Sequence, residues 1–116
     1  MKGLNNYMQK QYNNDYNESK IKFSYIVSNT GIITKKESDK LFDLMSSDIF
    51  DGTTDLDVEI GIFLFLCSNG LDFDEVISYY NEELTIDKIA DINDMIVNGT
   101  NEIAKIMIDL RIKDLI

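Results

Sequence analysis

The chain contains no histidine, no proline and no tryptophan, and it has only one cysteine. Histidine is the commonest general base and the commonest metal ligand, so Ser-His, Cys-His and His-zinc sites are excluded within this chain. One cysteine excludes an internal disulfide and is typical of proteins from a reducing compartment. Because Cys67 stands in an apolar run, we expect it to be a buried and unreactive thiol.

Basic residues are scarce: 11 Lys and Arg stand against 21 Asp and Glu, which gives a net charge of −10. Residues 1–40 carry +3 and residues 41–116 carry −13. Direct binding of nucleic acid is excluded by this balance, because phosphate contacts need Lys and Arg. The same argument excludes attraction to an anionic membrane surface. A basic protein partner is favoured electrostatically.

Long hydrophobic runs are also missing. The apolar run at residues 60–67 is far shorter than the ~20 residues of a membrane span. The polar residues after Met1 do not form the apolar core of a secretion signal. Asparagine, isoleucine and lysine are plentiful, which indicates an AT-rich coding sequence. We therefore expect a cytoplasmic protein of a bacterial host, encoded by the bacterium or its phage.

The length of 116 residues and the 44% hydrophobic content are typical of one globular domain. Composition changes near residue 20, so we predict a loose or weakly helical N-terminal segment at 1–19 and a single helical domain at 20–116. Residues 21–33 leave two interpretations open. The alternation of Ile21, Phe23, Tyr25 and Val27 favours a strand and a small β-hairpin. A helix through residues 20–28 is the alternative.

Clearer helix signals begin at Thr34. Thr34 and Glu37 have the spacing of a capping box, which predicts a helix that ends near Ser47. Thr54 or Asp55 then caps a second helix. Its body, residues 60–66, is apolar on nearly every side, which predicts a central buried helix.

The remaining chain predicts three further helices. Asn69-Gly70 is a left-handed stop signal, and Asp72 is expected to cap the next helix through the amide of Glu75. Thr85 and Thr100 are the next two helix starts. The expected inner faces are Phe73, Val76, Ile77 and Tyr80 on the first of these helices and Ile103, Ala104, Ile106, Met107 and Leu110 on the last. On the helix between them, apolar positions run at helical spacing through Ile86, Ile89, Ala90, Asn93, Ile96 and Val97. The predicted fold is mainly α, a compact bundle of four or five helices with an optional hairpin near residues 21–33.

No motif predicts catalysis or a bound ion. The stretch Asp51–Glu59, "DGTTDLDVE", is rich in carboxylates, but a calcium loop needs glycine at its sixth position and Leu56 stands there. No glycine lies in a phosphate-binding pattern. We expect no enzymatic activity, no metal and no cofactor.

Two surfaces are candidates for binding a partner protein. Between Asp43 and Asp94 there are fourteen acids and one base, Lys88. Carboxylates so placed can imitate the phosphates of nucleic acid and attract a basic protein. The candidate acidic face comprises Asp51, Asp55, Asp57, Glu59, Asp72, Asp74 and Glu75. The candidate apolar groove comprises Phe73, Tyr79, Tyr80 and Ile89, since tyrosine is enriched at binding hot spots.

The segment from Asp57 to Asp109 also resembles a known family. An acidic lead-in, the apolar "IGIFLFLCSNG", then "LDFDEVISYY" and "LTIDKIADINDMIVNGTNEIAKIMI" are similar to the C-terminal half of tail assembly chaperones of long-tailed phages. The resemblance implies a small, mainly helical cytoplasmic protein that coats the tape measure protein and helps to recruit tail tube subunits. It covers under half of the chain and carries no catalytic residue.

The leading hypothesis is therefore a non-catalytic phage-type assembly chaperone that holds partner helices during tail assembly. The alternative is an acidic nucleic-acid mimic that inhibits a host defence protein or another DNA-binding protein. The expected partners are a tape measure or tail tube protein in the first case and a basic nucleic-acid-binding protein in the second. Self-association into a homo-oligomer is compatible with both.

Overall fold

The computed structural model describes the backbone of residues 2–51 and 56–112 and the side chains of residues 15–46 and 57–111. The described residues form helices and connecting turns and contain no strand. The predicted mainly α class is confirmed. The helices are α1 (Lys2–Ser28), α2 (Lys35–Asp51), α3 (Leu56–Ser68), α4 (Phe73–Tyr80), α5 (Ile86–Asn98) and α6 (Thr100–Ile112).

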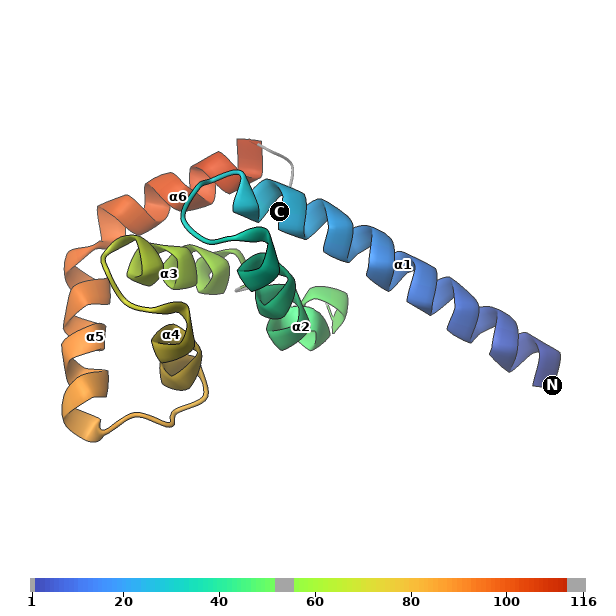
Figure 1. Ribbon diagram of the computed structural model, residues 1–116, viewed down its shortest axis with the longest axis horizontal. Coiled ribbons are helices and arrows are strands. Elements are labelled where there is room, and N and C mark those ends of the chain that lie inside the picture. Colours follow the sequence, from blue (N-terminus) through green and yellow to red (C-terminus); the bar gives the residue numbers. More distant parts are fainter. Residues whose placement is uncertain (1, 52–55, 113–116) are drawn as a thin grey trace.

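The helices form two groups (Figure 1). In the first, α2 folds back against α1, and the N-terminal half of α1 extends past it. In the second, α6 packs along α3, while α4 and α5 contact α3 from other sides. The 27 residues of α1 span about 40 Å, so this helix accounts for much of the longest dimension of 52 Å.

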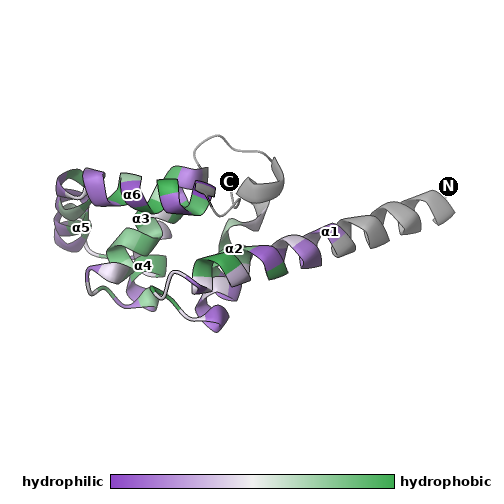
Figure 2. Cartoon of the chain, turned by 90° about the horizontal axis from the view of Figure 1, so that it is seen from above, coloured by the Kyte–Doolittle hydropathy of each residue, from purple (hydrophilic) through white to green (hydrophobic). Residues whose placement is uncertain are grey.

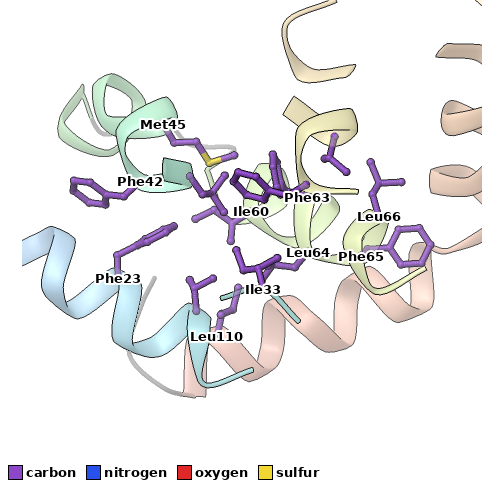
Figure 3. Close-up of a cluster of buried hydrophobic side chains, with 14 of the residues drawn as sticks. Phe23, Ile33, Phe42, Met45, Ile60, Phe63, Leu64, Phe65, Leu66 and Leu110 are labelled. Atoms are coloured by element: carbon purple, nitrogen blue, oxygen red, sulfur yellow. The ribbon is translucent and has the colours of Figure 1, made fainter. Parts of the chain in front are cut away.

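One hydrophobic core joins the two groups, and α3 lies at its centre. Five side chains of α3 are buried, on several sides of the helix: Ile60, Phe63, Leu64, Phe65 and Leu66. Figure 3 shows Ile60 and Leu64 among side chains of α1, α2 and α6, such as Phe23, Met45 and Leu110, whereas Phe65 lies at the far end of the cluster from Phe23. In Figure 2, most of α3 is hydrophobic, whereas α5 and α6 carry hydrophilic bands. The prediction of a central buried helix at 60–66 is confirmed.

The optional hairpin at residues 21–33 is not formed, because residues 21–28 continue α1. Phe23, Ile26 and Val27 are buried at helical spacing, whereas Ile21 is 71% exposed and Tyr25 is 67% exposed. The alternating apolar residues of the sequence therefore lie on two faces of one helix, one buried and one exposed. The helix alternative is the correct one.

Polar contacts fasten α1 to α2. The buried hydroxyl of Ser24 donates to the carboxylate of Asp39. Asp43 accepts from the hydroxyl of Tyr16 and from Lys20 Nζ at 3.1 Å. The Tyr16 hydrogen bond, and then Lys20, lower the pKa of Asp43 from its ordinary value despite partial burial.

The capping box at the start of α2 is present in both directions. The Thr34 amide donates to Glu37 Oε1 at 2.9 Å, and the Glu37 amide donates to Thr34 Oγ1 at 3.1 Å. Replacing Thr34 with alanine should destabilise the protein by about 1 kcal/mol, measured by chemical denaturation. Lys36→Ala is the control, since Lys36 is exposed in the same turn and its loss should change stability by less than ~0.5 kcal/mol. Equal effects of the two variants would contradict the role of the cap.

Several predicted boundaries and faces need correction. Helix α2 continues to Asp51 instead of ending near Ser47, and the proposed caps Thr54 and Asp55 lie outside the described residues. Asp72 occupies the N-cap of α4, but its side chain makes no capping hydrogen bond. Thr85 does cap α5, accepting from the Lys88 amide at 3.3 Å.

Only part of the run at helical spacing on α5 faces the core. The buried residue of this helix is Ile92, whereas Ile86 is 85% exposed and Val97 is 70% exposed. On α6, Ile103 and Leu110 are buried as predicted, but Ala104 is exposed. The reason is geometric: the apolar face of α5, which includes Ile86 and Val97, is wider than the stripe around Ile92 that touches the rest of the protein.

Candidate functional site

Two adjoining pockets open between α3, α4 and α5, and Tyr79 and Tyr80 line both. We call them together the tyrosine groove. The inner pocket has a volume of about 160 Å³ and is lined by Glu59, Ile62, Phe63, Leu66, Val76, Tyr79, Tyr80 and Ile96. The outer pocket has a volume of about 550 Å³ and is lined by Tyr79, Tyr80, Glu82, Leu84, Ile86, Ile89 and Asn93.

The stop signal after α3 turns the chain so that α4 can lie against it. Gly70 has a φ of 99°, which is readily adopted by glycine. The amide of Leu71 donates to the Leu66 carbonyl at 3.2 Å and that of Gly70 donates to the Cys67 carbonyl at 3.3 Å. These two bonds form a Schellman motif, so the predicted stop at Asn69-Gly70 is confirmed.

The position of α4 fixes both tyrosines. At its start, the ring of Phe73 packs on Phe63 with centroids 5.3 Å apart. At its end, the Tyr79 hydroxyl donates to Asn93 Oδ1 at 2.5 Å and the Tyr80 hydroxyl donates to Glu59 Oε2 at 3.2 Å. Burial raises the pKa of Tyr79 above its ordinary value, so this hydroxyl remains a donor at neutral pH. Each tyrosine thus links α4 to a different neighbouring helix.

The turn after α4 contains an unusual backbone conformation. Glu82 has a φ of 59°, in the left-handed region that glycine normally occupies at the end of a helix. Its amide donates to the Tyr79 carbonyl at 3.1 Å, and the Glu83 amide donates to the Ser78 carbonyl at 2.8 Å. This is a second Schellman motif, with a glutamate at the strained position beside the outer pocket.

The four residues predicted for the apolar groove have different positions. Tyr79 and Tyr80 line both pockets, and Ile89 lines the outer one. Phe73 lines neither pocket and is buried against Phe63. Glu82, Leu84 and Ile96 also line the groove, although they were not predicted for it. The one clue to them in the sequence was that each lies in, or just after, a predicted helix that already held a candidate residue.

Five of the seven residues predicted for the acidic face lie at the starts of α3 and α4, and some of them make contacts within the chain. Asp57 pairs with Arg111 at 3.6 Å and Glu75 pairs with Lys88 at 2.9 Å. Glu59 accepts from Tyr80 in the groove. Asp72 and Asp74 are exposed. Asp51 is the last residue of α2, with a side chain outside the described set, and Asp55 lies outside the described residues.

Among the described residues, no group of three or more His, Cys, Asp and Glu side chains could hold a metal ion. Burial, followed by the nearby Glu37 charge, raises the pKa of the half-buried Cys67 to about 11. Its thiol is therefore protonated, and poorly nucleophilic, at neutral pH. No helix in the described part of the chain is long and apolar enough to cross a membrane.

Comparison with known proteins gives no relative: no family model, no curated protein and no solved structure matches the chain significantly.

Proposed function

We propose that this chain is a non-catalytic protein-binding protein, a phage-type assembly chaperone that holds an apolar helix of a tail protein in the tyrosine groove. The supporting observation is the pair of pockets that share Tyr79 and Tyr80. Concave apolar sites with a few fixed polar groups are typical binding sites, and tyrosines at their centre are typical hot-spot residues.

The charge of the chain suits this role. Residues 41–116 carry −13, and strong like charge keeps protein complexes apart in solution. An apolar partner helix held in the groove is shielded from water while the acidic surface around it opposes aggregation. We propose a tape measure or tail tube protein as partner and the cytoplasm of a bacterial host as the location. Binding needs no cofactor or metal.

The alternative is an inhibitor that imitates nucleic acid. The acidic charge supports it, because an anti-defence mimic attracts a basic groove through carboxylates. The ion pairs that Asp57 and Glu75 form with Arg111 and Lys88 within the chain favour the groove instead, since carboxylates already paired with a base are less available to a partner.

Co-expression of the tagged chain with the products of the genes beside its own tests the proposal. We expect a tape measure or tail tube protein to be retained in the soluble fraction and to co-purify. Tyr80→Ala and Ile89→Ala should each weaken the retention, because both side chains line the groove. Circular dichroism checks that each variant is folded.

The matched variant replaces Asp55, Asp57, Asp72 and Asp74 with asparagine. Asparagine still caps helices, so the fold should persist, and a partner held by apolar contacts should be retained at low and high salt. The opposite result is a basic partner that the asparagine variant loses in a salt-sensitive way but that Tyr80→Ala and Ile89→Ala retain. This result would contradict the chaperone and support the mimic.

A further inference from the structure

The inner pocket has the size of one large apolar side chain. It encloses about 160 Å³ between side chains such as Ile62, Leu66 and Ile96. An apolar cavity of about 150 Å³ is known to accommodate benzene. A phenylalanine or leucine side chain from a partner therefore fits the pocket, and burying it there favours binding.

Each pocket of the tyrosine groove has one lining carboxylate. Glu59 lines the inner pocket, where it accepts from Tyr80, and Glu82 lines the outer pocket. No Lys or Arg is among the described residues that line either pocket. A partner with a basic residue on each side of its apolar anchor is complementary to this arrangement, whereas an acidic partner is repelled.

The backbone at Glu82 indicates that this carboxylate has a role beyond the turn. Its φ of 59° is a strained conformation for a residue other than glycine. Glycine would satisfy the same Schellman motif at lower cost. Strained conformations of this kind cluster at binding sites, and the Glu82 side chain lines the groove.

We infer that the tyrosine groove selects an amphipathic helix that inserts one large apolar side chain into the inner pocket and presents lysine or arginine to Glu59 and Glu82. The inference rests on the proposed function and specifies the chemistry of the partner. The occupant is a basic amphipathic helix of another protein, because the groove combines an apolar floor with two carboxylates and no lining base.

A labelled helical peptide of about 16 residues, roughly 24 Å long, is the probe. It is built from alanine and lysine, with one phenylalanine at its centre. Two matched peptides replace the phenylalanine with alanine or every lysine with glutamate. Fluorescence anisotropy with the full chain should show at least tenfold weaker binding without phenylalanine and no measurable binding of the acidic peptide.

The most informative variant is Glu82→Gly. It removes the groove carboxylate and relieves the left-handed strain, so the melting temperature should rise while affinity for the basic peptide falls roughly two- to fivefold. A destabilised variant would show that Glu82 supports the fold. A stabilised variant with unchanged affinity would remove Glu82 from the binding site. Either result overturns the assignment.

The double variant Glu59→Gln with Glu82→Asn should weaken binding of the basic peptide about tenfold. Its control is Asp15→Asn with Glu18→Gln, which removes the same net charge from exposed positions on α1 and should leave the affinity within about twofold. Equal losses in the two double variants would show non-specific attraction and overturn the inference. If no peptide binds but the co-expressed tail protein still does, the inference fails and the proposed function stands.

Discussion

Replacing Leu64 with alanine should lower the free energy of unfolding by about 2–5 kcal/mol. Leu64 is 0% exposed and lies in the middle of α3. Removing its isobutyl group forfeits apolar burial and leaves a cavity in a core that α3, α2 and α6 share (Figure 3). Because a domain of this size has a total stability of about 5–15 kcal/mol, much of the chain would be unfolded in moderate denaturant.

Chemical denaturation followed by circular dichroism measures this loss. The matched control is Ile86→Ala, since Ile86 is 85% exposed and its truncation should change stability by less than ~0.5 kcal/mol. A loss below ~1 kcal/mol at Leu64 would mean that α3 is not the centre of the core. The Ile86 variant would then deserve a binding test as well, because Ile86 lines the outer pocket of the tyrosine groove.

Gly99→Ala should also be strongly destabilising, by about 1–3 kcal/mol. Gly99 is buried between α5 and α6, and a Cβ there would lie 2.0 Å from Cζ of Phe65 and within 2.7 Å of two further ring atoms. The φ of Gly99 is −103°, which alanine adopts easily. The cost is therefore steric, because the rigid ring of Phe65 is itself buried.

Gly61→Ala provides the comparison. A Cβ at Gly61 would lie 2.8 Å from Cγ of Met107 and 3.4 Å from Cγ2 of Ile103, which is a milder clash than at Gly99, and the methionine side chain can partly adjust. Alanine also favours the helix by about 1 kcal/mol, so the Gly61 variant should be close to neutral. The double variant Gly99→Ala with Phe65→Leu should recover part of the Gly99 loss. Thermal unfolding of the wild type, the two glycine variants and the double variant measures these changes in stability. Equal losses at the two glycines would contradict the close approach of Phe65.

Local signals in the sequence were sufficient where neighbours along the chain determine the structure. The capping box at Thr34 and the stop at Asn69-Gly70 depend on hydrogen bonds within a few residues, so both were predicted correctly. The continuous apolar segment 60–66 likewise required burial on every side. These features predicted the helical class and the central helix.

Features that depend on distant contacts were not predictable in the same way. On α5 isoleucine occurs on several faces, and only the contact with α3 determines that Ile92 is buried and Ile86 is exposed. Residues 21–28 have a pattern that fits a strand or a helix, and burial of Phe23 against Phe42 of α2 selects the helix. In the groove, Tyr79 and Tyr80 were chosen for their type, whereas Glu82 required knowledge of its φ angle.

The central position of α3 has a consequence for synthesis on the ribosome. Helix α3 is complete at Ser68, but its long-range partner α6 ends at Ile112, about 44 residues later. At a translation rate of 5–20 residues per second, synthesis of these residues takes roughly 2–9 s, and α6 cannot cover the apolar surface of α3 before then. During that interval α1 and α2 are the available partners, and Asp57 and Glu59 at the start of α3 act as charged gatekeepers against association of nascent chains.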